Sequence, residues 1–377
     1  MDYIKLKDVC TINMGQSPDS DSYNENGNGV PFFQGNADFG ERYPVTRKWC
    51  SAPTKMAAPE DILISVRAPI GAMNYANEEC CIGRGLAALT PNREKVLPEY
   101  IFWLLKGKNA ELNSKGTGST FKAIGRNILE ETLVPDISLE KQTECSIILE
   151  KTYKVISSRK QQLQKLDELV KARFVEMFGA YPLNPMGWKK GTIRDVVADV
   201  RYGSSRPAVD GGKYPYLRMN NITYGGELDL SDVKRIDVPE NELEKCTVRR
   251  GDVLFNRTNS KELVGKTCVY DRDEMMVLAG FVIRVKVNDL VLPEFLSAFL
   301  NTEFSKRTLL GMCKAAIGQA NINAQEMQSI GIYIPPIELQ KEFVQFKNQT
   351  DKSKAAVQKA LDEAQLLFDS LMQKYFG

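Results

Sequence analysis

The sequence of 377 residues contains no histidine. A Ser-His-Asp triad, a Cys-His pair and any zinc site with an imidazole ligand are therefore excluded. There is also no G-x-x-x-x-G-K-[ST] loop, which argues against an ATP motor. Asn184-Pro185-Met186 lacks the second proline and the aromatic residue of an N-P-P-Y/F methyltransferase segment. Catalysis by this chain would have to rely on carboxylate, lysine, tyrosine or cysteine side chains.

The chain also lacks a large excess of one charge. It contains 50 Lys+Arg and 48 Asp+Glu residues, which gives a formal net charge of +2. A strongly basic chain would have indicated nucleic-acid binding, but a basic face can be offset by acidic surface elsewhere. None of the eight cysteines is spaced C-x-x-C, so we expect neither a zinc knuckle nor a redox pair. No apolar run has the length of a signal peptide or a membrane helix. We therefore expect a cytoplasmic protein whose thiols are reduced and structural.

The chain does contain an internal repeat at half its length. Val96–Tyr100 (VLPEY) recurs as Val291–Phe295 (VLPEF), and Asp61-Ile62-Leu63 recurs as Asp252-Val253-Leu254. Further pairs follow in the same order: residues 8–9 with 195–196, 31–36 with 215–220, Val134-Pro135 with Ile334-Pro335, and Phe178-Gly179 with Phe376-Gly377. The offset drifts between 184 and 200, as expected for variable loops on a shared scaffold. The sequence therefore predicts one unit of about 190 residues that is used twice.

Each half begins with a mixed α+β segment and ends with a helical one. Short apolar runs such as Ile62–Val66, Val253–Phe255 and Phe281–Val285 are candidate buried strands. Proline predicts the start of a short helix at Pro98 and again at Pro293. The segments from Leu139 to Phe178 and from Leu339 to Phe376 then place apolar residues at a 4-3 spacing: Leu149, Tyr153, Ile156, Leu163, Val170, Phe174 and Met177, and later Val357, Leu361, Ala364, Phe368, Leu371 and Tyr375.

Heptad-like spacing of this length favours two long helices that pack against each other. A helix of about 40 residues is roughly 60 Å long, which is longer than a small domain is wide. The alternative is that each helix packs back on its own globular unit.

Four segments, taken in order, resemble the specificity (S) subunits of type I restriction–modification systems. Asp61–Gly71 is similar to a segment common in their target-recognition domains, and Gly251–Ser260 is similar to another version of it. Ile334–Lys341 resembles the family's proline-led entry into a long helix. Met177–Gly179 followed by Asn184–Trp188 resembles the exit from the first helix. The chain departs from this pattern where Pro135-Asp136 stands in place of a second Pro-Pro pair, which concerns the entry into the first helix.

The resemblance implies an α+β fold with two tandem globular target-recognition domains, each followed by a long helix, the two helices pairing as an antiparallel coiled coil. The implied domains are residues 1–137 and 181–336, and the implied helices are residues 138–180 and 337–377. The implied role is a non-catalytic DNA specificity subunit that reads a bipartite site in double-stranded DNA. Two methyltransferase (M) subunits would dock on the helices and bring S-adenosylmethionine, and restriction/translocase (R) subunits can join them. The chain itself would hold no cofactor and no metal.

Geometry is consistent with this role, because two half-sites on one face of DNA lie roughly 34 Å apart, within the reach of such helices. A tandem repeat can read an asymmetric site, whereas a homodimer is tied to a palindrome. Arginine can bind guanine and Asn or Gln can bind adenine through two hydrogen bonds, while Lys and Ser more often contact phosphate. Candidate DNA-facing residues lie in polar segments: Gln16, Ser17, Asn36, Arg67, Lys115, Ser119, Lys122, Ser204, Arg206, Arg218, Asn220, Asn221, Arg257, Asn259, Lys314, Gln319 and Asn321.

Arg67 and Arg257 are favoured among these because each follows a candidate buried strand and so has a rigid base. Gly15 and Gly203 are interpreted as turn formers that allow close backbone approach. Aromatic residues such as Phe32, Phe33, Tyr214 and Tyr216 are candidates for stacking on bases, but we expect core packing for them, as for Trp103.

Two other functions stay open at this level. Asp61 and Asp252 occupy equivalent places, so a duplicated acidic nuclease site is conceivable, but an aspartate that forms a turn before a strand explains both. A structural adaptor that binds protein would suit the low net charge. Salt dependence separates the adaptor from a DNA reader, because DNA affinity falls steeply as salt rises.

Overall fold

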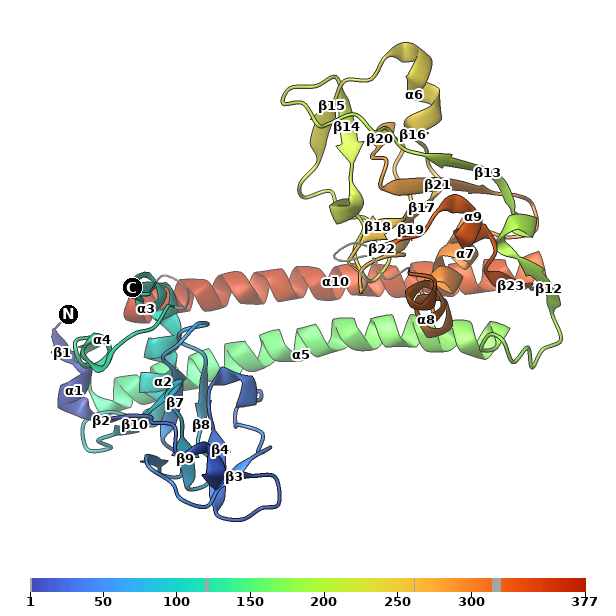
Figure 1. Ribbon diagram of the computed structural model, residues 1–377. Coiled ribbons are helices and arrows are strands. Elements are labelled where there is room, and N and C mark those ends of the chain that lie inside the picture. The colour runs from blue at the N-terminus through green and yellow to red at the C-terminus, as the bar shows by residue number, and fades with distance from the viewer. Residues whose placement is uncertain (1, 119–121, 261, 314–319) are drawn as a thin grey trace. The chain divides into compact units, whose positions relative to one another are not determined.

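The computed structural model describes residues 2–118, 122–260, 262–313 and 320–377 (Figure 1). They form two compact units. Unit 1 contains the chain up to Lys160 together with Lys359–Gly377, and unit 2 contains Gln161–Gln358. The 40-residue helices α5 (Leu139–Phe178) and α10 (Ile337–Phe376) each contribute one part to each unit.

Unit 1 contains two main sheets. Its strands are β1 (Tyr3–Lys5), β2 (Cys10–Met14), β3 (Tyr23–Asn24), β4 (Val30–Phe33), β5 (Trp49–Cys50), β6 (Met56–Ala57), β7 (Ile62–Ser65), β8 (Met73–Tyr75), β9 (Cys80–Ile82), β10 (Leu86–Pro91) and β11 (Leu133–Pro135). One sheet is antiparallel with the order β2-β10-β7-β8, and the other has the order β3-β5-β4-β9-β6 with β4 and β9 parallel. The short strands β1 and β11 pair separately.

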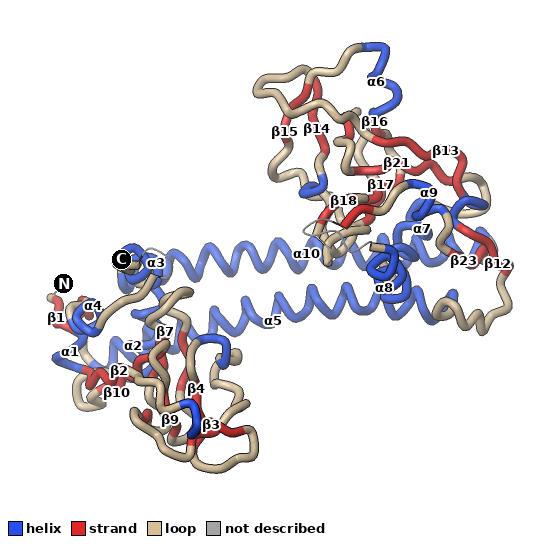
Figure 2. The backbone as a smooth tube through the Cα atoms, viewed as in Figure 1, coloured by secondary structure: helices blue, strands red, loops and turns tan. Residues whose placement is uncertain are grey.

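Unit 2 has the same plan. Its strands are β12 (Lys189–Thr192), β13 (Val197–Tyr202), β14 (Tyr214–Leu217), β15 (Lys234–Ile236), β16 (Thr247–Val248), β17 (Val253–Asn256), β18 (Thr258–Asn259), β19 (Thr267–Val269), β20 (Met276–Leu278), β21 (Val282–Val287), β22 (Ala320–Asn321) and β23 (Gly331–Ile334). The order β13-β21-β17-β19 matches β2-β10-β7-β8 strand for strand, and the parallel pair β14–β20 matches β4–β9. The strands gather in the domain part of each unit (Figure 2). The duplication expected from the sequence is confirmed.

Most short helices occupy matching places as well, and η1 and α6 are each found in one unit alone among the described residues. Those of unit 1 are α1 (Leu6–Val9), α2 (Pro98–Gly107), α3 (Asn109–Ser114), α4 (Arg126–Glu130) and the 3-10 turns η1 (Ser20–Ser22) and η2 (Asn36–Asp38). Those of unit 2 are α6 (Glu240–Cys246), α7 (Pro293–Leu300), α8 (Glu303–Met312), α9 (Ala324–Gln328), η3 (Ile193–Val196) and η4 (Met219–Asn221). Both α2 and α7 begin with proline, as predicted.

The cores confirm most of the burial predictions. Trp103 and Phe33 are fully buried, and Phe32 and Tyr216 nearly so, whereas Tyr214 packs at the edge of a core. All eight cysteines are buried, and none of them forms a disulfide within the described part of the chain. Burial raises the pKa of the Cys268 thiol to about 12, which keeps it protonated and unreactive at neutral pH.

The long helices pair within each unit. In unit 1 the first part of α5 meets the last part of α10, with the Tyr153 and Phe368 ring centroids 6.2 Å apart. In unit 2 the last part of α5 meets the first part of α10, with Phe174 and Phe343 centroids 5.3 Å apart. The order of partners is reversed along the two helices, so they pair antiparallel as expected.

The entry into both long helices is built around a buried glutamine. Gln142 accepts a hydrogen bond from the Leu97 backbone N–H (2.9 Å) and donates to the carbonyls of Lys95 (3.0 Å) and Ile137 (2.9 Å). Gln340 makes the same three contacts in unit 2, to Leu292 (2.8 Å), Leu290 (3.0 Å) and Pro335 (2.9 Å).

This arrangement corrects the sequence alignment at the helix entry. Gln142 and Gln340 are 198 residues apart, not 200, so Ile137-Ser138 rather than Pro135-Asp136 corresponds to Pro335-Pro336. The departure noted in the sequence therefore leaves the entry geometry of the first helix unchanged. The match of Val134-Pro135 with Ile334-Pro335 gave the wrong register, because proline is not the residue that anchors the turn.

Candidate nucleic-acid interface

Four segments of unit 1 meet at one edge of its sheets, where β2, β4, β7 and β9 end. Backbone hydrogen bonds tie them together: Gly15 N–H to Leu86 O (2.9 Å), Gln16 N–H to Ile82 O (3.1 Å), Gly85 N–H to Gln34 O (3.2 Å) and Val66 N–H to Gly85 O (2.9 Å). We call residues 15–17, 34–36, 66–67 and 83–85 the first recognition edge. Four strand ends on a bonded scaffold hold side chains more rigidly than a free loop does.

The structure brings most of the predicted residues of the first half to this edge. Gln16 and Arg67 are exposed there, and Ser17 and Asn36 are half-buried. Lys122 lies next to the edge, because its carbonyl accepts a hydrogen bond from Ala68 N–H at 3.0 Å.

Two other predicted residues of this half have a different outcome. Lys115 is exposed but forms an ion pair with Glu111 at 2.6 Å, one turn earlier on the same stretch of chain. Ser119 lies outside the described residues.

Sequence reasoning missed two exposed residues at the same edge. The Gln34 amide donates to Ser17 Oγ (2.9 Å), and Arg84 sits at the turn between β9 and β10 with its backbone N–H directed at the same hydroxyl (3.4 Å). Gln34 directly follows the buried strand β4. The same criterion, a polar residue directly after a buried strand, favoured Arg67 and would also have identified Gln34. Arg84 follows β9, and the sequence Cys-Cys-Ile is too short to predict that strand.

Unit 2 presents a matching edge made of residues 202–206, 218–221, 257–259 and 279–281, which we call the second recognition edge. Three of its backbone bonds repeat those of the first edge: Gly203 N–H to Val282 O (3.2 Å), Ser204 N–H to Leu278 O (2.6 Å) and Arg257 N–H to Phe281 O (3.0 Å). Exposed or half-buried polar residues here include Asn220 and Asn259, with Asn321 opposite Thr258 on β22. The two halves thus share a scaffold but differ in the side chains that it carries.

The arginines of the second edge have partners. Arg206 binds Glu242 through two hydrogen bonds (2.8 and 3.1 Å), and Arg218 binds Asp232 (2.8 Å). The guanidinium of Arg257 lies 4.9 Å above the ring of Tyr202. Exposed ion pairs of this kind are worth only about 0–1 kcal/mol, so a phosphate or a base can displace the carboxylates.

Two candidate DNA-facing residues of the second half are buried and bonded within the domain instead. Asn221 is 2% exposed, and its side chain accepts from Arg218 N–H (2.9 Å) and donates to the Asp229 and Asp232 carbonyls (2.9 and 3.1 Å). It builds the turn after β14 and has no group left for DNA. Ser204 is 9% exposed and accepts from Arg206 N–H at 3.2 Å. Lys314 and Gln319 lie outside the described residues.

The favoured arginines are not structural equivalents. Arg257 donates its backbone N–H to Phe281 and accepts from Ile322, just as Val66 bonds Gly85 and Ile124. Arg257 therefore matches Val66, and Arg67 matches Thr258. A shift of one residue along a strand moves a side chain to the other face.

The glycines and aspartates singled out in the sequence have structural roles. A Cβ on Gly15 would lie 2.2 Å from Gly83 O, and one on Gly203 would lie 2.3 Å from Ala279 O. The close approach is thus to the neighbouring strand's own backbone. The Asp61 and Asp252 carboxylates each accept a backbone N–H at 2.8 Å, from Ala58 and Arg249, which confirms the turn that opens each strand.

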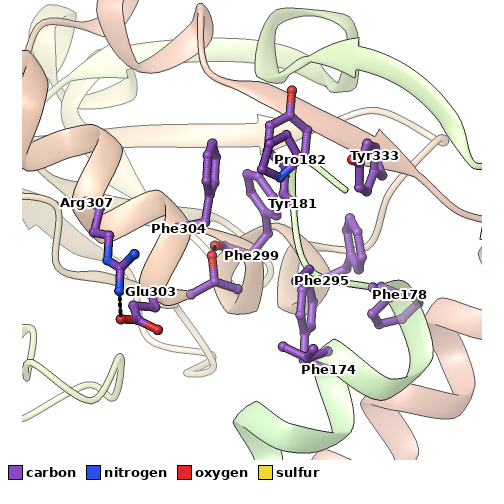
Figure 3. Close-up of a pocket in the computed structure, with 14 residues that line it drawn as sticks. Phe174, Phe178, Tyr181, Pro182, Phe295, Phe299, Glu303, Phe304, Arg307 and Tyr333 are labelled. Carbon is purple, nitrogen blue, oxygen red and sulfur yellow. Dashed lines mark hydrogen bonds and ion pairs between the residues drawn. The ribbon is translucent and has the colours of Figure 1, made fainter. Parts of the chain in front are cut away.

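Unit 2 also contains an aromatic pocket of about 320 Å³ where α5 ends (Figure 3). Tyr181 packs between Phe304 (4.5 Å) and Tyr333 (4.6 Å), and the ion pair of Glu303 with Arg307 lies at its side. The lining is mainly aromatic and gives no paired acid and base for catalysis. This pocket anchors the segment that leaves α5.

Comparison with known proteins agrees with this geometry. The sequence matches the type I restriction modification DNA specificity domain twice, over residues 1–168 and 185–364. It is 22% identical to the EcoKI type I restriction enzyme specificity subunit of Escherichia coli over 347 residues, covering 85% of this chain and 74% of that one. It is 41% identical over 160 residues to the MjaX specificity subunit of Methanocaldococcus jannaschii, which is 42% of this chain and 38% of that subunit.

A solved structure shares the fold. The type I restriction-modification S subunit from M. genitalium superposes with a TM-score of 0.57 at 12% identity, covering 100% of this chain and 96% of that one. Among the described residues, neither 40-residue helix nor any other is apolar enough over sufficient length to cross a membrane. Two matched domains cover most of the sequence, and the chain belongs to the type I restriction modification DNA specificity family.

Proposed function

We propose that this chain reads a bipartite site in double-stranded DNA, one half-site at each recognition edge. The observation that carries the proposal is the duplication of one bonded scaffold with different polar side chains. Gln16, Gln34 and Arg67 stand at the first edge, whereas Arg206, Arg218 and Arg257 stand at the second. Different side chains on equal scaffolds allow the two half-sites to differ, which two-fold symmetric dimers do not.

We further propose that the chain is not itself catalytic and that two methyltransferase subunits dock on α5 and α10 and supply S-adenosylmethionine. Support comes from apolar side chains on the outer faces of the helices in unit 1. Ile147 and Val155 of α5 are 47% and 46% exposed, and Leu366 and Leu367 of α10 are 71% and 55% exposed. Contiguous exposed apolar patches mark protein interfaces, and we assign these four side chains to such a docking surface. Restriction/translocase subunits would join this complex.

The test is DNA affinity as a function of salt, for the chain alone and with its methyltransferase subunits. A reader that contacts about six phosphates should lose roughly three orders of magnitude in affinity between about 50 and 200 mM salt. We expect the complex to follow this slope and to prefer one bipartite sequence. A flat response from the complex would instead favour a protein-binding adaptor.

The purified chain alone should neither methylate nor cleave DNA when S-adenosylmethionine, ATP and Mg²⁺ are added. Addition of the methyltransferase subunits should restore methylation. Methylation or cleavage by the pure chain would contradict the non-catalytic role.

A further inference from the structure

The two recognition edges differ in the turn that links a parallel strand pair to the antiparallel sheet. In unit 1 this turn is Gly83-Arg84-Gly85, between β9 and β10, and in unit 2 it is Ala279-Gly280-Phe281, between β20 and β21. The turns are equivalent, because Gly83 N–H donates to Phe33 O (2.9 Å) as Ala279 N–H donates to Leu217 O (2.8 Å).

Both turns close in the same way. Leu86 N–H donates to Gly83 O at 3.0 Å, and Val282 N–H donates to Ala279 O at 2.9 Å. Each turn is also bonded to the strand end that carries Val66 or Arg257. The backbone position is therefore fixed by the fold, and only the side chains differ between the halves.

Arg84 and Phe281 give the two turns opposite chemistry. Arg84 is exposed and has no ion-pair partner among the described residues, unlike Arg206 and Arg218 of the other edge. Phe281 is 51% exposed, next to Tyr202 at 43%. One turn offers a cation with its donors free, and the other offers an apolar ring.

We propose that this turn is a specificity-determining element in both halves. Arg84 donates two hydrogen bonds to O6 and N7 of a guanine in one half-site, and Phe281 contacts the methyl group of a thymine in the other. The inference rests on the proposed function. It adds that the same turn presents a hydrogen-bond donor at its second residue, Arg84, in one half and an apolar ring at its third residue, Phe281, in the other.

The experiment is methylome sequencing of cells that express the chain with its methyltransferase subunits. Arg84→Ala and Arg84→Gln should each change one guanine position in one half-site and leave the other half-site intact, with a loss of discrimination of roughly 5- to 150-fold. Arg84→Gln should favour adenine there, because glutamine pairs with adenine N6 and N7. Phe281→Ala should relax one thymine position in the opposite half-site.

Matched controls lie at the far ends of the same strands. Arg93 follows β10 and pairs with Glu60, and Leu290 follows β21 and is 45% exposed. Arg93→Ala and Leu290→Ala should leave the motif unchanged. Arg84 is exposed and is replaced in two ways, so the test does not depend on the folding of a single variant.

The outcomes separate this inference from the proposed function. If the unaltered chain directs methylation to no bipartite motif, the proposed function fails. Suppose that the unaltered chain does direct methylation to a bipartite motif. If the Arg84 and Phe281 variants then keep that motif or relax both half-sites at once, the turn is not the specificity element. A change confined to one position in one half-site for each variant supports it.

Discussion

At the scale of single residues, two buried glutamines connect the domains to the long helices. Gln142 and Gln340 are 1% and 0% exposed, and each satisfies one N–H and two carbonyls between the domain and the start of a long helix. A buried polar group that loses its partner costs about 1–3 kcal/mol. Each amide therefore ties a long helix to the loop before α2 or α7.

Replacement of Gln142 with Met should lower the free energy of unfolding by about 3 kcal/mol, because three backbone groups lose their partner inside unit 1. Urea unfolding followed by circular dichroism measures the loss. The control is Gln164→Met on the same helix, where the amide is exposed and bonds only Glu168, and it should change the value by less than about 0.5 kcal/mol. Equal effects of the two variants would contradict the role of Gln142.

Arg257 is the residue of the second edge whose guanidinium is held by an aromatic ring rather than by a carboxylate. Arg257→Ala should weaken or relax recognition in one half-site by about 1–3 kcal/mol, and leave the other half-site intact. Methylome sequencing of cells with the assembled complex checks this. Arg250→Ala is the control, because Arg250 is 58% exposed, pairs with Asp273 at 2.7 Å and precedes β17 instead of following it. An unchanged motif for Arg257→Ala would remove that residue from the interface.

At the scale of elements, one lysine of α10 contacts both α5 and the domain of unit 2. Lys354 of α10 is 17% exposed and binds Asp167 of α5 at 2.6 Å and also Glu227, in the segment between β14 and β15. Burial lowers the pKa of Lys354, but the hydrogen bonds that its ammonium donates to Asp167 and Glu227 outweigh this effect and raise the pKa overall. The ammonium is therefore charged at neutral pH and connects three segments.

Lys354→Met should destabilise unit 2 by about 1–2 kcal/mol, because two carboxylates lose a shared partner while remaining partly solvated. Thermal unfolding measures the change. Lys352→Met on the exposed side of the same helix should have almost no effect. If both variants unfold at the same temperature as the unaltered chain, the three-way contact contributes nothing.

At the scale of the whole molecule, the pairing of α5 with α10 connects two copies of one domain plan. In an antiparallel helix pair, the numbers of two facing residues add to a constant. The contacts Tyr153–Phe368 and Asp167–Lys354 share this constant, so Leu163 faces the region of Gln358. Any change of helix length must therefore be made in both helices to keep the apolar seam in register.

Insertion of one heptad after Leu163 together with one after Gln358 adds about 10 Å to the pair. If the helices set the spacing of the half-sites, the DNA spacer should lengthen by up to about three base pairs, and the half-sites should not change. Methylome sequencing reports both. Insertion after Leu163 alone should break the seam and abolish methylation. Altered half-sites with the double insertion would refute the spacer role.

The sequence alone was sufficient for the repeat, the α+β plan, the long helices and the family resemblance. These features depend on local periods and on letters such as Val-Leu-Pro-Glu that recur in order, and both are readable along the chain. It also predicted that Asp61 and Asp252 form turns, because a short carboxylate bonds its own neighbouring backbone.

Tertiary structure decided what depends on residues far apart in the chain. Asn221 is buried, hydrogen bonds between strand ends bring Gln34 and Arg84 to the first recognition edge, and a one-residue shift separates Arg67 from Arg257. The alignment of the helix entry was likewise set by Gln142 rather than by proline. The identity of a polar residue does not show whether its side chain bonds to solvent, to DNA or to a distant backbone group. The partner is determined only when the chain folds.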